Sequence, residues 1–392
     1  MAKRRVVVLF GGRSAEHEIS CISARSVIDA LDPETNDVLP VGITREGRWR
    51  VLPGPPSLPS ETGRLPEVDA TGTPAGIVTE IAAGLGPSPE LVVADGSRTQ
   101  VDVVFPVLHG PFGEDGATQG LLELAGVPFV GAGVLGSAIG MDKAVQKVLF
   151  AAAGLPVVPH EVVREPDWLE DREGVAARTE ALGYPVFTKP ASLGSSVGIS
   201  KVHDAGELDA GMREAFHFGR KAVIERGLEG VREIECAVLG NDDPVASVAG
   251  EIAPQGHEFY DYEAKYLDEH GAQLLIPAHL SPDVLERVQR MAVGAFRAIE
   301  SWGMARVDFF LLGDDLWVNE INTIPGFTSI SMYPKLWEAS GLTYGALVER
   351  LLDLAVERHE SERARSNEIG RVRSGRPEAA AVTLPTGGRP GT

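Results

Sequence analysis

The chain of 392 residues has only two cysteines, Cys21 and Cys236, which are too few for a disulfide framework. It also lacks a long apolar segment at its start, where Val6–Phe10 meets a glycine pair and is too short for a signal peptide or a membrane span. Basic residues are scarce, since 36 Lys and Arg are outnumbered by 56 Asp and Glu, which gives a net charge of −20. This charge argues against nucleic acid or an anionic membrane as a partner. We therefore expect a cytoplasmic protein.

Three common site motifs are missing as well. The glycine turn "FGGRSAEHEIS" follows a strand and opens a helix, but it is not the GxGxxG fingerprint of dinucleotide-binding proteins. Its "HEIS" lacks the second histidine of the zinc-protease motif HExxH. Neither GKS nor GKT occurs anywhere, so the chain is not a P-loop protein.

The pattern of strands and helices predicts an α/β fold of several domains, because the chain is long for one core. In the first part we expect strands at Val6–Phe10, Val38–Ile43 and Val101–Leu108, a helix from an N-cap at Ser20 to Leu31, and a hairpin at Glu46-Gly47. Val101–Leu108 is apolar throughout, as in a buried parallel strand. Residues 53–86 are rich in Pro and Gly and read as an irregular excursion.

The rest of the chain is predicted to form two further domains and a tail. We expect helices at Ala138–Ala153, Val175–Leu182, Pro282–Ser301 and Tyr344–Glu357, extended segments at Pro156–Val163, Val186–Lys189 and Ala222–Glu225, and longer strands from Glu233. The apolar periodicity stops after Arg358, which predicts a disordered tail. The predicted boundaries are 1–131, 132–231, 232–358 and 359–392.

The most informative segments are "ARVDFFLLG" and "LWVNEINTIPG", which both read as strands of one hairpin. Strand side chains alternate between faces, so Arg306 and Asp308 share a face, as do Glu320 and Asn322. Hard oxygen ligands without His or Cys suit magnesium, which usually brings phosphates. Taken singly, such residues more often lie on a solvent-exposed face of a sheet. Four functional groups in register, ending in the turn "NTIPG", favour a site.

Other motifs are weaker when taken alone. Lys189 ends an apolar strand and precedes the loop "PASLGSSVGISKV", a phosphate cradle in principle. His109 lies at the end of a buried strand, where open α/β sheets bind ligands, and a structural role is equally compatible with it. Glu16, close to the glycine turn, could hold a substrate ammonium group, but taken alone it is more simply a helix-capping carboxylate. Glu225 and Glu233, taken alone, are ordinary acidic residues. The segment "YDYEAKY" holds three of the six tyrosines beside a lysine, as in a loop that closes over a ligand.

Taken together, these segments resemble the D-alanine–D-alanine ligases, an ATP-grasp family of peptidoglycan synthesis. The resemblance rests on "GGRSAEHEIS", "LHGPFGEDGATQG", "GMDK", "TKPASLGSSVGISKV", "VIERGL", "YDYEAKY", "RVDFF" and "NEINTIPGFTSISMYP", in the family's order over most of residues 5–355. It implies a three-domain ATP-grasp architecture with an N-terminal parallel-sheet domain, a cytoplasmic homodimer, and ATP and D-alanine as substrates. It also implies two magnesium ions, with manganese as an alternative metal.

The resemblance further implies a role for each matching residue. Lys143, Lys189, Ser195 and Ser196 would contact the ATP phosphates; Glu225 and the Leu228 backbone would hold the adenine, and Glu233 the ribose. Asp308, Glu320 and Asn322 would hold the magnesium ions. Glu16 and His109 would bind the first D-alanine, and Arg306 with the N–H of Gly326 would form the oxyanion hole. Lys265, Ser331 and Met332 would receive the second D-alanine, and Tyr266 would tie the mobile loop to Ser195 and Glu16.

Two other functions compete with this interpretation. A catalytically silent ATP-binding paralogue is expected to have lost Arg306, Asp308, Glu320 or Lys265, and all four are present. A D-alanine–D-lactate ligase generally replaces the tyrosine-rich loop, so the intact "YDYEAKY" argues against it. The predicted activity is therefore ligation of two D-alanine molecules through a D-alanyl phosphate.

Overall fold

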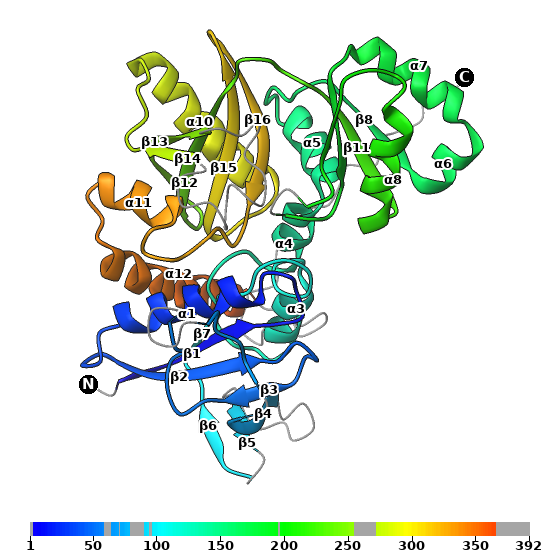
Figure 1. The fold of residues 1–392 in the computed structure, drawn as a ribbon. Coiled ribbons are helices and arrows are strands. Elements are labelled where there is room, and N and C mark those ends of the chain that lie inside the picture. Colours follow the sequence, from blue (N-terminus) through cyan, green and yellow to red (C-terminus); the bar gives the residue numbers. More distant parts are fainter. Residues whose placement is uncertain are drawn as a thin grey trace, which may run out of the picture.

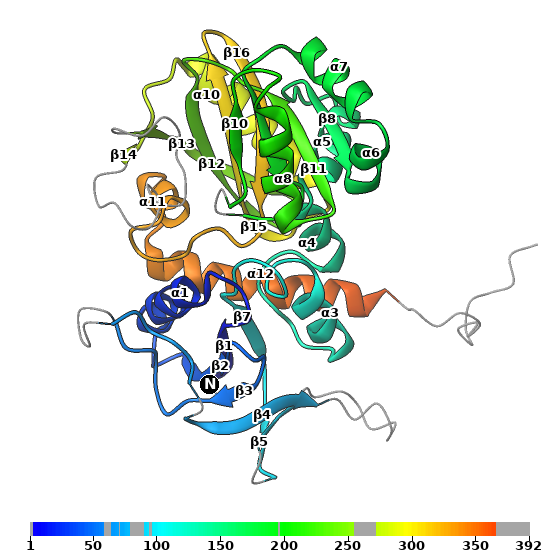
Figure 2. The ribbon, with the colours of Figure 1, turned by 45° about the vertical axis from the view of Figure 1, so that its right-hand side comes forward.

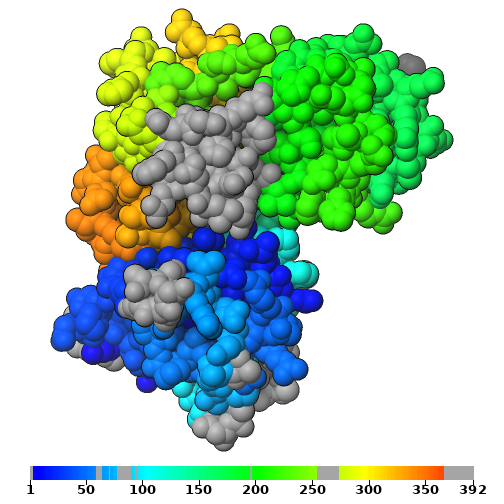
Figure 3. Space-filling model, in the orientation of Figure 1, coloured from blue at the N-terminus to red at the C-terminus, as the bar shows by residue number. Residues whose placement is uncertain are grey.

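A computed structural model describes residues 3–58, 64–69, 71–78, 90–93, 96–194, 197–254 and 272–365. The described residues form three sheets: one belongs to the N-terminal part, and the other two lie next to each other above it (Figure 1). Figure 3 shows the same division as a blue N-terminal part below and a green central part at the upper right. None of the helices in the described ranges is long and apolar enough to cross a bilayer.

The N-terminal sheet has seven strands in the order β6-β5-β4-β3-β2-β1-β7. Strand β1, next to the edge strand β7, pairs in parallel with both β2 and β7, as the apolar runs predicted, and the remaining neighbours are antiparallel. The strands are β1 (Arg4–Gly11), β2 (Asn36–Ile43), β3 (Trp49–Val51), β4 (Thr73–Val78), β5 (Glu90–Val93), β6 (Arg98–Gln100) and β7 (Val103–Pro106), and the helices are α1 (His17–Ala30) and α3 (Ala117–Leu124).

Two expectations for this part were wrong. The segment 53–86, predicted to be irregular, contains the strand β4. Its sequence, TPAGIV, does not indicate a strand, because proline and glycine are both uncommon inside strands. Helix α1 begins at His17, so Ser20 is not its N-cap. Ser20 is instead fully buried, where its hydroxyl accepts a hydrogen bond from Gly11 N–H and donates one to the carbonyl of Val107. It thereby fastens the helix to the ends of β1 and β7.

The central sheet has four antiparallel strands in the order β10-β9-β11-β8. The helix predicted at Ala138–Ala153 is in fact two helices, because Asp142 has extended backbone angles and its carboxylate caps the second helix at the N–H of Val145. The strands are β8 (His160–Arg164), β9 (Val186–Pro190), β10 (Ser200–Val202) and β11 (Lys221–Arg226), and the helices are α4 (Val134–Met141), α5 (Lys143–Ala152), α6 (Glu165–Glu170), α7 (Arg172–Leu182) and α8 (Leu208–Phe218).

The C-terminal sheet has five antiparallel strands in the order β14-β13-β12-β15-β16. Its last helix continues to Ala364, and thus includes the first residues that we had assigned to a disordered tail. The strands are β12 (Arg232–Gly240), β13 (Val245–Pro254), β14 (Ala272–Leu275), β15 (Gly303–Leu312) and β16 (Asp315–Asn322), and the helices are α10 (Pro282–Ala298), α11 (Met332–Ala339) and α12 (Tyr344–Ala364).

Helix α12 joins the N-terminal sheet to the C-terminal one. It lies between them in both ribbon views (Figures 1 and 2) and contacts α1, β7 and β15. One apolar core runs through the junction, from Val8 and Phe105 of the first sheet to Phe327, Leu347 and Leu351. The N-terminal and C-terminal parts are thus held together by a shared core.

Candidate functional site

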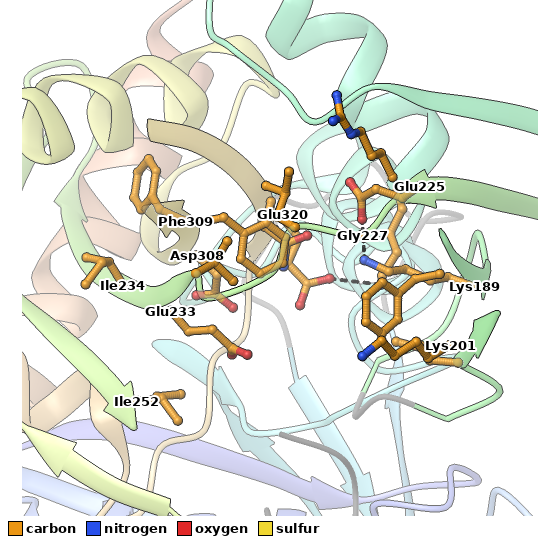
Figure 4. A pocket seen from close by; sticks show the side chains of 18 of the residues that line it. Lys189, Lys201, Glu225, Gly227, Glu233, Ile234, Ile252, Asp308, Phe309 and Glu320 are labelled. Carbon is orange, nitrogen blue, oxygen red and sulfur yellow. Dashed lines mark hydrogen bonds and ion pairs between the residues drawn. The ribbon is translucent and has the colours of Figure 1, made fainter. Parts of the chain in front are cut away.

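A cavity of about 540 Å³ lies between the central and C-terminal sheets. Figure 4 shows the carboxylates of Glu233, Asp308 and Glu320 on one side of it and the lysines Lys189 and Lys201 on the other. Its size is that of an ordinary small-molecule site. Eight predicted site residues line it: Lys143, Lys189, Glu225, Leu228, Glu233, Arg306, Asp308 and Glu320.

The polar face of the β15–β16 hairpin has the predicted arrangement. Arg306 pairs with Asn322 across the two strands, and Asp308 pairs with Glu320. The Arg306 guanidinium donates to both oxygens of Asp308, at 2.7 and 2.8 Å, and Asn322 Nδ2 donates to Asp308 Oδ2 at 2.9 Å. The apolar neighbours Val307, Phe309 and Ile321 are buried on the opposite face. The four polar side chains thus share one face of the hairpin, as predicted.

A second carboxylate also holds Arg306. Glu235 Oε2 lies 3.0 Å from Arg306 Nε, and the Glu235 side chain is only 6% exposed. Burial alone would lower the pKa of Arg306, but Asp308 and Glu235 raise it well above the ordinary value. The guanidinium therefore stays charged at one wall of the cavity.

Two lysines of the cavity wall, Lys143 and Lys189, and a third behind it, Lys147, have acidic partners. Lys143 Nζ lies 3.0 Å from Glu320 and donates to the carbonyl of Leu193 at 2.7 Å. Lys189 and Lys147 both form ion pairs with Glu225, the latter at 2.5 Å. Burial would raise the pKa of Glu225, yet the two lysines lower it to about 2. The Glu225 carboxylate is thus ionised at neutral pH although it is buried.

Helix α5 positions part of this group by docking on the edge strand β16. Gln146 accepts a hydrogen bond from Ile321 N–H at 3.1 Å and donates to the carbonyl of Ile321 at 3.3 Å. Lys147 donates to the carbonyl of Asn319 at 3.3 Å. The helix is therefore joined to the strand that carries Glu320 and Asn322.

The predicted metal ligands fit a magnesium ion that shares its coordination with a nucleotide. Asp308 and Glu320 are directly opposite each other and provide hard oxygens, and Asn322 turns its Nδ2 toward Asp308, which leaves its amide oxygen for another partner. Among the described residues no group of three or more His, Cys, Asp or Glu side chains gathers as a metal site.

The predicted first-substrate residues lie in the N-terminal domain, at the carboxyl ends of β1 and β7. His109 is 6% exposed, and burial lowers its pKa despite the nearby Glu16, so the ring is neutral. Gly110 has a φ of +73°, and a Cβ there would lie 3.2 Å from Glu16 Oε2. The turn after His109 is therefore pressed against the Glu16 carboxylate.

A third carboxyl group, Glu114, belongs to the same place. Its Oε1 accepts a hydrogen bond from Gly110 N–H at 2.8 Å. Burial raises its pKa to about 8, and the charges of Glu16 and Glu320 add to this rise. Glu114 is thus protonated at neutral pH, between the N-terminal and the C-terminal halves of the site.

Gly326, Ser331 and Met332 lie together in the turn from β16 to α11. A Cβ on Gly326 would lie 3.2 Å from Ser331 Oγ, and this oxygen accepts a hydrogen bond from Thr328 N–H at 3.1 Å. Met332 is the first residue of α11. The other predicted residues, Ser195, Ser196, Lys265 and Tyr266, lie outside the described residues.

Lys147, Glu235 and Glu114 are not among the residues predicted from the sequence. Lys147 is one helical turn after Lys143, and Glu235 is two strand positions after Glu233, so the periodicity that was applied to the hairpin could have found both. Glu114 lies within the quoted "LHGPFGEDG", but its burial depends on residues far along the chain. Only the structure could single it out.

Comparisons with known proteins identify the family to which this chain is similar. The family model described as D-ala D-ala ligase N-terminus matches residues 5–132, and the one described as D-ala D-ala ligase C-terminus matches residues 149–353. A D-alanine–D-alanine ligase of Kineococcus radiotolerans is 50% identical over 91% of this chain and 97% of its own length. One of Thermoanaerobacter pseudethanolicus is 49% identical over 92% and 99%.

Solved structures share the fold. The D-alanine–D-alanine ligase of Coxiella burnetii has a TM-score of 0.79 at 37% identity, covering 93% of this chain and 97% of that one. The VanG D-Ala:D-Ser ligase of Enterococcus faecalis has a TM-score of 0.77 at 34% identity, covering 90% and 100%. The predicted fold class and the resemblance are confirmed.

Proposed function

The chain belongs to the D-alanine–D-alanine ligase family, and on this premise we propose that it joins two D-alanine molecules while ATP becomes ADP and phosphate. The observation that carries the proposal is that the lysines Lys143 and Lys189 line the same cavity as the acidic hairpin with Arg306. Phosphoryl transfer needs both sets of charges, one for the phosphates and one for the metal. The product, D-alanyl-D-alanine, serves peptidoglycan synthesis, and through it cell wall biogenesis and cell shape.

The reaction has two steps, because a carboxylate is a poor acyl donor. The carboxylate of the first D-alanine takes the γ-phosphoryl group of ATP, which gives D-alanyl phosphate and ADP. The amine of the second D-alanine then attacks the carbonyl carbon, loses a proton, and expels phosphate. An acyl phosphate hydrolyses in water, so closure of the site over this intermediate has a chemical purpose.

At the nucleotide, we assign Lys143 and Lys189 to the phosphates, together with Ser195 and Ser196. Glu225 and the Leu228 backbone would hold the adenine, and Glu233 the ribose hydroxyls. In support of this assignment, the five of these residues that are described all line the cavity. The ion pair of Lys143 with Glu320 would open as the phosphates enter.

We propose that Asp308, Glu320 and Asn322 hold two magnesium ions that arrive with the nucleotide, with manganese as an alternative. Bound there, the metal would neutralise charge on the phosphoryl group in transfer. The hard oxygen donors and their open arrangement support this assignment. Arg306, with its raised pKa, would stay charged beside the metal.

At the amino-acid end, Glu16 and His109 would bind the first D-alanine, and Arg306 with the N–H of Gly326 would stabilise the oxyanion. Lys265, Ser331 and the Met332 backbone would receive the carboxylate of the second D-alanine. Tyr266 would link the loop that carries it to Ser195 and Glu16. The close approach of Gly326 to Ser331 supports a turn that serves both substrates.

A coupled assay of ADP release tests the function with D-alanine, L-alanine, D-lactate and D-serine as substrates, the last because VanG is a fold relative. We expect turnover that depends on D-alanine and gives D-alanyl-D-alanine. L-Alanine should be a poor first substrate, because inversion misplaces either its ammonium group or its methyl group. Equal turnover of both enantiomers would refute the proposal. We also propose a cytoplasmic homodimer, which light scattering on the purified chain would test.

A further inference from the structure

Glu225 has two cationic partners, although one would be enough to neutralise it. Lys147 is 1% exposed, Glu225 2% and Lys189 9%, so three charged groups share one nearly dry volume. Burying such a group is costly unless each charge has a partner. The second lysine therefore calls for an explanation.

The two lysines differ in what they can reach. Lys189 and Glu225 both line the cavity, whereas Lys147 is not among the described residues that do. Lys147 extends from the middle of α5 behind Glu225, and its ammonium group is also bound to the carbonyl of Asn319. Lys189 can turn toward a ligand, whereas Lys147 is fixed.

Nucleotide binding would separate these roles. In the proposed function Lys189 contacts the phosphates, so it can no longer neutralise Glu225 fully. A buried carboxylate without a cation takes up a proton, and a protonated acid no longer presents two acceptor oxygens. A cation fixed behind Glu225 prevents this outcome.

We propose that Lys147 is a positioning residue, which keeps the Glu225 carboxylate charged and directed into the cavity when Lys189 turns to the nucleotide. The inference rests on the proposed function, from which the adenine role of Glu225 comes. A charged carboxylate accepts a hydrogen bond from the 6-amino group of adenine and repels the 6-oxo group of hypoxanthine. Lys147 would therefore set the preference for a 6-aminopurine.

The test compares the binding of ADP and IDP by calorimetry, with magnesium and without D-alanine. These two nucleotides differ only at the 6-position and its ring proton. We expect Lys147→Met to lower the ADP preference about ten- to a hundredfold, which is the contribution of a hydrogen bond to a charged group. Lys147→Arg keeps the charge and should keep most of the preference. The matched control is Lys221→Met, which removes a lysine paired with Asp142, the N-cap residue of α5.

A double-mutant cycle shows whether Lys147 acts through Glu225. In a Glu225→Gln background, the further change Lys147→Met should leave the ADP preference unaltered. If Lys147→Met alone does not fold, Glu225→Gln is compared with the double variant Glu225→Gln/Lys147→Met instead. A folded Lys147→Met variant with the wild-type preference would overturn the inference, as would an equal effect in both backgrounds. Because the measurement needs no D-alanine, failure of the ligase reaction would show separately, in the ADP-release assay.

Discussion

Arg306 carries a guanidinium whose two partners in the cavity, Asp308 and Glu235, are both carboxylates. The pairs fix its plane before any substrate is bound, which would suit the oxyanion role proposed for Arg306. A donor that is already oriented needs no rearrangement when negative charge develops on a carbonyl oxygen. The same carboxylates keep the residue charged in a site that burial would otherwise make unfavourable for a cation.

Glu114 shows the opposite effect, since its surroundings disfavour its charged form. Its pKa is about 8 in the folded protein and lies near 4.5 in the unfolded chain. Between these values the folded state holds a proton that the unfolded state has released, so stability falls as the pH rises. We expect Glu114→Gln to remove this dependence, because an amide is neutral at every pH and can still accept the hydrogen bond of Gly110.

Urea unfolding of the ligand-free protein between pH 5 and pH 8.5 measures the effect. The gain of Glu114→Gln over wild type should grow steadily across this range. Burial lowers the pKa of His109, which opposes the trend in the lower half of the range, but it does so in both proteins and cancels in the difference. Parallel stability curves for the two proteins would show that Glu114 is ionised in the folded state.

At the scale of single elements, the sequence predicted the structure best where a pattern lies within one strand or two adjacent strands. The hairpin face of Arg306, Asp308, Glu320 and Asn322 follows from alternation within two adjacent strands, although a register shift between Asp308 and Phe309 interrupts their regular pairing. Lys147 on α5 pairs with Glu225 on β11, and no local periodicity in the sequence relates these two residues. Such pairs depend on how elements dock, which a sequence pattern does not encode.

The errors at element ends have local chemical causes. The break between α4 and α5 comes from a single capping carboxylate, Asp142, within an otherwise helical pattern. Helix α12 continues beyond Arg358 through polar residues, where the apolar period no longer marks it. The roles of Ser331 and Met332 came from the family resemblance alone, because a serine before a helix usually indicates only a cap.

The hairpin also allows a prediction about metal dependence. Glu320→Gln keeps the size of the side chain but removes the charge that would hold magnesium. Glu320 is partly exposed and pairs with Lys143, so the fold should survive while turnover at low magnesium drops sharply. Added magnesium should restore part of the activity, as seen in magnesium titrations of ADP release.

The control for this experiment lies on the same strand. Asp315 begins β16 at the exposed turn, and Asp315→Asn should leave the magnesium titration unchanged. If Glu320→Gln unfolds the protein at ordinary temperature, the glutamate is structural. If it turns over normally at low magnesium, the ligand assignment is wrong.

At the scale of the whole molecule, a site divided between domains works only if the domains keep their relative positions. Helix α12 supplies apolar contacts across the junction, and Arg358 adds a polar one near the end of this helix. Its guanidinium donates to the carbonyl of Gly131 at 2.8 Å and lies 4.3 Å from the centre of the Phe129 ring. Residues 129–131 lead from the N-terminal sheet toward α4.

Arg358 should therefore stabilise the whole chain and not only its own helix. It is 5% exposed, and Arg358→Ala would leave the carbonyl of Gly131 without its donor and remove the stem that packs around it. We expect the free energy of unfolding to fall by about 2–3 kcal/mol, measured by urea denaturation. Arg358→Met keeps much of the packing and should lose less. Arg363→Ala, on an exposed turn of the same helix, should change the free energy of unfolding little. An equal effect of Arg358→Ala and Arg363→Ala would mean that the polar contact at the junction contributes nothing.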